Sequence, residues 1–104
     1  MKTSELTGAA LDWAVAKAEG YTGVALESRT GEWYTPSTDW AQGGPIIERE
    51  AMSVGSHLDG EEWIARDYWA IYEQSGPTPL IAAMRCYVAS KLGDEIEIPG
   101  GLSC

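Results

Sequence analysis

The clearest pattern of apolar and polar positions lies near the C-terminal end of the chain. Side chains recur there at spacings of three and four, which is typical of one face of a helix. Thr78 supplies a capping oxygen, Pro79 suits the first helical position, and Gly93 favours an end. We therefore expect a helix that begins at Pro79 and ends before Gly93. The positions on its face are Leu80, Ala83, Met84, Tyr87, Val88, Lys91 and Leu92.

A second helical pattern covers residues 4–19. Gly20 follows it, at the place where a left-handed C-terminal residue is expected, while Gly8 weakens the first turn. Candidate capping oxygens come from Thr3, Ser4 and Thr7. The stripe along this helix consists of Leu6, Ala10, Trp13 and Lys17.

Residues 51–75 have the pattern of an antiparallel sheet. Asp59-Gly60 is a hairpin signal that places Leu58 opposite Glu61. Along the next strand, residues 63–66 alternate between the two faces, and residues 68–72 either continue that strand or form a third one. Gly76-Pro77 ends the sheet region.

Three further segments have β-type sequences. Residues 24–27 and 32–34 are separated by the turn-forming cluster 28–31, which predicts a hairpin that Pro36 stops. Residues 94–99 alternate acids with Ile96 and Ile98, which predicts an edge strand with its isoleucines inward.

The central segment carries helix starts and helix breakers together. Residues 37–39, Ser-Thr-Asp, offer three caps before Trp40, whereas residues 43–45, Gly-Gly-Pro, should interrupt any long helix. Pro45 suits the first position of a short helix over residues 45–50. The resulting order of elements predicts an α+β fold, with two main helices, N-terminal and C-terminal, laid on a small antiparallel sheet.

Length and charge set limits on function. The chain has 104 residues and a mass of 11.2 kDa, so we expect residues 1–104 to form a single domain. Seven Lys and Arg against sixteen Asp and Glu give a net charge of −9, which excludes a general binder of duplex nucleic acid or of an anionic membrane.

The N-terminus does not resemble a signal peptide, and no apolar run is long enough for a membrane helix. These features predict a cytoplasmic protein with reduced thiols. Cys86 is then a buried helix residue, and Cys104 is a second free thiol.

Signatures of catalysis and of metal binding are missing from the sequence. There is no phosphate-binding glycine loop, no Gly-x-Ser-x-Gly, no HExxH and no paired CxxC. His57 is the single histidine, and we interpret it as a strand residue. The acids of residues 48–67 are a solvated face in the simplest interpretation, although a catalytic carboxylate pair could be drawn from them. We expect no catalytic residue, no metal and no cofactor.

The aromatic residues are more informative, since the chain has five Trp, five Tyr and no Phe. Trp13 and Tyr87 have the spacing of core residues. The rings between Trp33 and Tyr72 exceed what so small a core holds, so several should line either a ligand cleft or an interface between subunits. Arg66 offers a flat donor for an anion. The candidate ligand-binding residues are Trp33, Tyr34, Ser37, Thr38, Asp39, Trp40, Trp63, Arg66 and Trp69.

Three blocks of sequence resemble the NinX-like family of temperate tailed phages: residues 3–16, 34–40 and 76–93. The Pro-Ser-Thr-Asp block and the start of the last helix are also similar to the phage ABA sandwich domain. The resemblance implies a phage accessory protein of unknown function, acting in the cytoplasm of the infected bacterium.

Three hypotheses of function follow from these observations together with the resemblance to phage accessory proteins. The first is a non-enzymatic, homo-oligomeric protein that sequesters a small nucleotide-type immune signal of the host. Its tryptophans would stack on the ligand, Arg66 would pair with phosphate, and residues 37–39 would bind ribose or base. The alternative is an interaction module that binds or inhibits a host protein. The third hypothesis is a hydrolase that uses His57.

Overall fold

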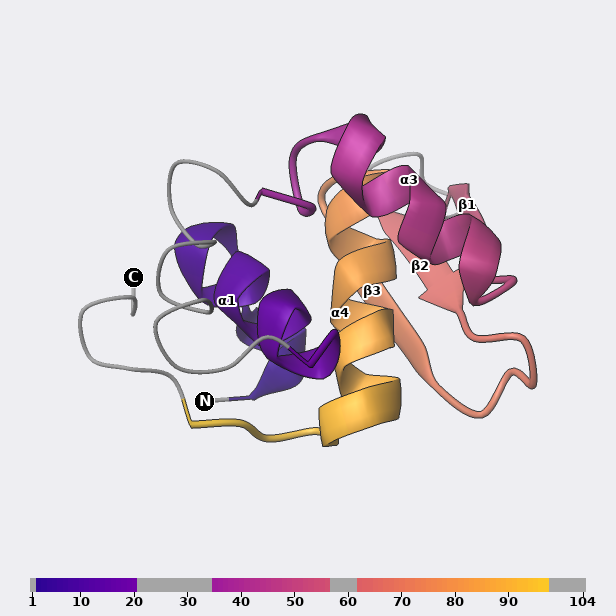
Figure 1. The fold of residues 1–104 in the computed structure, drawn as a ribbon. Helices are drawn as coiled ribbons and strands as arrows, with labels where there is room; N and C mark the ends of the chain where they lie inside the picture. Colours follow the sequence, from indigo (N-terminus) through magenta and orange to yellow (C-terminus); the bar gives the residue numbers. More distant parts are fainter. Residues whose placement is uncertain (1, 21–34, 57–61, 98–104) are drawn as a thin grey trace.

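The C-terminal helix α4, Pro79–Leu92, occupies the centre of the computed structural model, between the N-terminal helix and the sheet (Figure 1). The structure describes residues 2–20, 35–56 and 62–97. Thr78 caps α4, because its Oγ1 accepts a hydrogen bond of 3.1 Å from the Ile81 N–H. Gly93 ends it with a φ of +93°, a value that favours glycine. Both predicted ends of this helix are confirmed.

Helix α4 is buried around most of its circumference, beyond the single predicted stripe. Every residue from 82 to 89 is buried, because α1 packs on one side while β2 and β3 pack on another. Even Arg85 lies inside, where its Nε donates to the Leu6 carbonyl and its Nη1 to the Ser75 carbonyl, both at 2.8 Å. The helix therefore joins the N-terminal segment to the sheet.

The N-terminal helix begins later than its pattern predicts. Thr3–Glu5 form a short 3-10 helix, η1, and the α-helix α1 covers Gly8–Ala18. Leu6 is extended between them and fully buried, and Gly8 takes a φ of +54°. This break replaces the predicted first turn, because a left-handed glycine redirects the chain. Gly20 follows α1 with a positive φ, as expected.

The central helix α3 runs without interruption over Trp40–Arg49, so the predicted break at residues 43–45 is wrong. Asp39 caps it by accepting a hydrogen bond of 3.0 Å from the Ala41 N–H. Pro45 removes one helical donor, the partner of the Ala41 carbonyl. Both residues face solvent, where water can satisfy that carbonyl, so the helix tolerates the proline.

Within the described residues, three antiparallel strands form a sheet in the order β1–β2–β3: Ser53–Ser56, Trp63–Arg66 and Glu73–Gly76. Ala65 is fully buried and pairs with Val54 on β1 and with Gln74 on β3. The α+β class and the small antiparallel sheet are thus confirmed, with α3 as an additional full helix.

Residues 68–72 were predicted to be part of a strand, and this prediction is wrong. They form the loop that joins β2 to β3. The predicted hairpin over residues 24–34 and the turn at residues 58–61 lie outside the described residues. The predicted edge strand over residues 94–99 is reduced, in its described part, to an isolated antiparallel bridge between Glu95 and Lys2, although Ile96 is buried as expected.

Trp13 and Tyr87 belong to the core, as predicted from their spacing. Cys86 is fully buried beside them, and burial raises the pKa of its thiol to about 12. A thiol that stays protonated is a packing group and a poor nucleophile. None of the helices in the described part of the chain is long and apolar enough to cross a membrane.

Candidate binding site

Asp67 holds the loop between β2 and β3 in one shape, because it accepts two hydrogen bonds within the loop and donates a third. Its Oδ1 accepts from the Tyr72 N–H at 2.8 Å, its carbonyl accepts from the Ala70 N–H at 3.0 Å, and its own N–H donates to the Tyr72 carbonyl at 3.3 Å. Ala70 has a φ of +57°, a left-handed conformation that is costly for a residue with a Cβ. These contacts therefore fix the backbone conformation of the loop.

This loop directs large apolar side chains into solvent. Tyr68, Trp69 and Ile71 are 65%, 74% and 72% exposed. The rings of Tyr68 and Trp69 pack edge to face, with centroids 4.8 Å apart. Together these three residues form what we call the aromatic loop surface.

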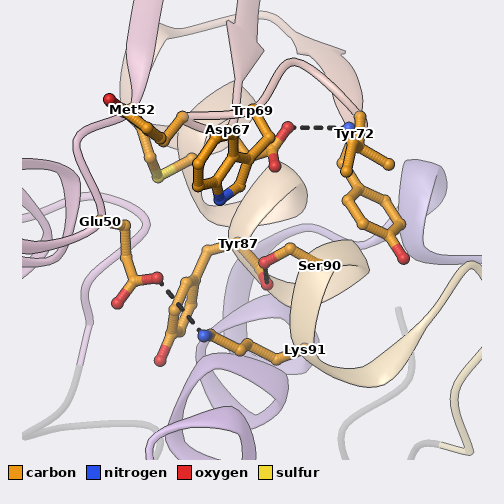
Figure 2. A pocket seen from close by; sticks show the side chains of 10 residues that line it. Glu50, Met52, Asp67, Trp69, Tyr72, Tyr87, Ser90 and Lys91 are labelled. Atoms are coloured by element: carbon orange, nitrogen blue, oxygen red, sulfur yellow. Dashed lines mark hydrogen bonds and ion pairs between the residues drawn. The ribbon is translucent and has the colours of Figure 1, made fainter.

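A pocket of about 300 Å³ lies beside the aromatic loop surface. Its walls come from the loop, from the residues after α3 and from the last turns of α4. Figure 2 shows Trp69 extending toward Tyr87, with Met52 beside the indole. The lining residues are Glu50, Met52, Asp67, Tyr68, Trp69, Ile71, Tyr72, Tyr87, Ser90 and Lys91.

Between the lining residues Glu50 and Met52, the chain contains a second left-handed alanine. Ala51 has a φ of +52°, and the N–H groups of Ala51 and Met52 donate to the carbonyls of Glu48 and Ile47 at the end of α3. Two non-glycine residues with positive φ thus flank one pocket. The hydrogen bonds of Ala51 and Met52 are the usual pattern at a helix C-terminus, where the left-handed position is most often glycine.

Two of the lining residues, Glu50 and Lys91, belong to a chain of ion pairs that continues to Arg49. Lys91 Nζ lies 3.4 Å from Glu50 Oε1 (Figure 2). Outside that view, Glu50 Oε2 accepts from Arg49 Nε at 3.0 Å. Lys91 Nζ is also 5.9 Å from the centroid of the Tyr87 ring, within the range of a cation–π contact. One wall of the pocket is therefore already adapted to a cation.

Behind the pocket, the Tyr87 hydroxyl donates to Glu19 Oε2 at 2.5 Å and accepts from Arg49 Nη2 at 3.1 Å. Burial, together with the hydrogen bond to the Glu19 carboxylate, raises the pKa of Tyr87 well above its ordinary value. The phenol stays protonated and anchors the ring, so this wall of the pocket is preorganised.

The candidate residues predicted from the sequence are distributed over several places. Trp69 is in the pocket described above. Ser37, Thr38 and Trp40 line a separate groove of about 200 Å³ beside residues 78–81. Ser37 is buried there, and its N–H donates to Asp12 Oδ1 at 2.9 Å.

The remaining candidates have other surroundings. Asp39 caps α3, Trp63 is partly buried against the core, and Arg66 Nε lies 2.6 Å from Glu73 Oε1. Trp33 and Tyr34 lie outside the described residues. Among the candidates that the structure describes, only Trp69 is therefore brought to the larger pocket.

Sequence reasoning missed most of the pocket. The uncharged run of residues 68–72 after Asp67 was a usable signal, because large apolar side chains in a loop have nowhere to pack. Nothing in the sequence indicated Met52, Ser90 or Lys91, since these residues meet the loop only through the packing of α3 and α4.

The side chains of the pocket include rings, two carboxylates and one ammonium group. Among the described residues that line it there is no histidine or thiol, and Ser90 Oγ donates to the Tyr87 carbonyl at 2.7 Å. No group of three His, Cys, Asp or Glu that could hold a metal occurs in the described ranges. Stacking, apolar packing and ion pairing are what these side chains offer.

The family model described as bacteriophage P22 NinX matches residues 2–91. No curated protein matches the sequence. The family match covers α1, α3, the sheet and nearly all of α4, and with them every residue that lines the pocket. The chain therefore belongs to the NinX family of phage accessory proteins.

Proposed function

We propose that this phage accessory protein acts by binding a partner protein on the aromatic loop surface and in the pocket beside it. The observation that carries the proposal is the exposure of Tyr68, Trp69 and Ile71 on a loop whose backbone is fixed by Asp67. The alternative of a protein-interaction module, raised from the sequence, thereby becomes the leading function.

Exposing apolar side chains of this size to water is unfavourable in free energy. Each side chain would gain about 1.5–3 kcal/mol from full burial, and contiguous apolar patches on small proteins mark sites of interaction. Tryptophan and tyrosine are also the residues that most often dominate the binding energy of protein interfaces. A loop that keeps Ala70 strained while it exposes these groups is consistent with selection for binding.

A small nucleotide is the second candidate occupant. Trp69 and Tyr87 offer ring faces on which a base could stack, and Lys91 offers a positive charge. However, the carboxylates of Glu50 and Asp67 line the same pocket and would repel phosphates. Charge therefore favours a protein partner, and the sequestering of a nucleotide-type signal remains the less supported function.

A surface-displayed library of random linear peptides tests the leading function. The library is selected for binding to the native protein and depleted with a Trp69→Ser variant. We expect enriched peptides whose affinity falls about tenfold or more with Trp69→Ser, as for an interface hot spot. The matched control is Trp40→Ser, which removes another exposed tryptophan, 55% exposed, from the separate groove and should leave affinity unchanged.

Two results would contradict the proposal. One is a selection that enriches no peptide, or only peptides that bind the Trp69→Ser variant equally well. The other is a saturable change in tryptophan fluorescence with a nucleotide that is lost in Trp69→Ser, because that result assigns the pocket to the second candidate. Thermal unfolding of both variants verifies that each is folded.

A further inference from the structure

The pocket combines ring faces with carboxylates, which is the chemistry of a site for an organic cation. Four of its lining residues are aromatic, and two are acids, Glu50 and Asp67. The faces of aromatic rings carry negative potential, so they attract ammonium and guanidinium groups. The rings are those of Tyr68, Trp69, Tyr72 and Tyr87.

One wall of the pocket already holds a cation of this protein. Lys91 Nζ lies over the Tyr87 ring and beside Glu50, yet its side chain is 44% exposed. A lysine so exposed has little binding energy to lose on moving away. Glu50 is therefore an acceptor that an incoming cation can share or take over, while Arg49 keeps its contact with Glu50.

Charge complementarity decides what kind of partner fits. Two acids and one lysine line the pocket, and the whole chain carries a net charge of −9. A second copy of this chain would bring the same excess of negative charge, which opposes its approach. A basic segment is attracted instead, and its charge would speed the encounter.

We propose that the pocket receives an arginine or lysine side chain from a basic segment of the partner protein. The cationic group stacks against Trp69, pairs with Asp67 and competes with Lys91 for Glu50. The apolar residues that flank it pack on Tyr68 and Ile71. This inference rests on the proposed function, for which it names the chemistry of the partner.

The indole N–H resonances of the protein provide a direct test, with the Trp69→Leu variant identifying the signal of Trp69. The probes are N-acetyl-arginine amide, N-acetyl-lysine amide and N-acetyl-citrulline amide, the last of which has nearly the shape of arginine without its charge. We expect a saturable shift of the Trp69 signal with one or both cations and none with citrulline. No shift with either cation, or an equal shift with citrulline, overturns the inference.

A variant that is expected to bind the cationic probe more tightly provides a second test. Replacing Lys91 by glutamine removes the resident cation, so the cationic probe that shifts Trp69 should bind about threefold more tightly, as expected for a lost exposed ion pair. The matched control is Lys17→Gln, because Lys17 Nζ also lies near a ring, 5.2 Å from the Trp13 centroid, but lines no part of this pocket. Equal affinity in the Lys91→Gln and Lys17→Gln variants would contradict the competition with Lys91.

Failure of this inference can be told apart from failure of the proposed function. Peptides selected on the aromatic loop surface are synthesised again with each arginine replaced by citrulline and each lysine by norleucine. We expect a loss of affinity of about tenfold or more at one anchor position. If the neutral peptides bind as well and still depend on Trp69, the cation site is wrong and the docking surface stands.

Discussion

Tyr87 on α4 donates a hydrogen bond of 2.5 Å to Glu19, which follows the last residue of α1. Arg49, the last residue of α3, donates to both oxygens of the same carboxylate, at 2.7 Å and 3.1 Å. The three helices thus meet at one acid. Because Tyr87 also lines the pocket, the contacts of Glu19 position a wall of the candidate site from behind.

Replacing Glu19 by glutamine tests this junction. Burial opposes the charge of Glu19, but the hydrogen bonds from Arg49 and Tyr87 outweigh it, so the pKa of Glu19 lies below its ordinary value of 4.5. Its charge therefore stabilises the fold at neutral pH, and this stability is lost as the pH falls through the folded-state pKa. We expect Glu19→Gln to lower the free energy of unfolding at neutral pH by about 1 kcal/mol, since solvent screens the half-exposed Arg49.

Urea unfolding, followed by tryptophan fluorescence over a series of pH values, measures the effect. The difference between the native protein and Glu19→Gln should shrink as the pH falls below 4.5. Glu48→Gln is the control, because it removes an exposed carboxylate of α3 outside these hydrogen bonds. A constant difference at all pH values would argue that the glutamine side chain simply packs badly.

The ionisation of Asp12 on α1 makes the stability of the fold depend on pH in the opposite direction. Burial raises the pKa of Asp12, and the hydrogen bond from the Ser37 N–H reduces this shift only in part. A raised pKa means that stability is greatest below the unfolded pKa and falls as the pH rises through the folded value. Asp12→Asn keeps an acceptor for the Ser37 N–H without the buried charge, so we expect it to be at least as stable as the native protein at neutral pH.

Asp12→Ala is the comparison for that variant. It leaves the buried Ser37 N–H without its acceptor and should cost about 1–3 kcal/mol of stability. Urea unfolding at neutral pH should thus place Asp12→Asn at or above the native protein and Asp12→Ala clearly below it. Equal losses in the two variants would show that the negative charge itself is required.

The ends of α4 could be predicted from the sequence because their causes are local. Thr78, Pro79 and Gly93 each act within one turn of the helix, so their residue types suffice. The burial of Arg85 could not be predicted, because its partners, the carbonyls of Leu6 and Ser75, come from distant segments. Burial of a charge depends on tertiary contacts that no spacing along the helix reveals.

The candidate site was predictable only in part, for the same reason. A surplus of rings indicated that some lie at the surface, and Trp69 does. The assignment of residues 68–72 to a strand followed their β propensity, which the hydrogen bonds of Asp67 override. The loop lies beside Lys91 and Glu50 because of the way α4 and α3 pack. No local pattern in the sequence predicts that packing.

The left-handed Ala70 leads to a stabilising substitution. Glycine adopts a positive φ without the Cβ penalty, so Ala70→Gly should raise the free energy of unfolding by up to about 1 kcal/mol, even though glycine makes the unfolded chain more flexible. Ala83→Gly, in the buried middle of α4, is the control and should lower stability by about 1 kcal/mol or more. A similar loss of stability in the two variants would contradict the left-handed conformation of Ala70.

Gly43 and Gly44 on α3 appeared in the sequence as helix breakers, but the structure gives them different roles. A Cβ on Gly43 would collide with the Pro36 carbonyl and lie 2.7 Å from Leu80 Cδ1. The backbone of α3 therefore approaches the 36–39 turn and α4 through a position that only glycine fits. On Gly44 the nearest atom to a Cβ is Trp40 Cε3, at an ordinary 3.9 Å.

The two glycines should consequently respond to alanine with opposite signs. Gly43→Ala must displace a backbone carbonyl and a buried leucine, so we expect a loss of about 1–3 kcal/mol of stability, as in overpacked cores. Gly44→Ala gains helix propensity without a clash and should raise stability by about 0.5–1 kcal/mol. Urea unfolding of the two variants measures both, and a gain for Gly43→Ala would show that α3 does not pack against Pro36 and Leu80 at this distance.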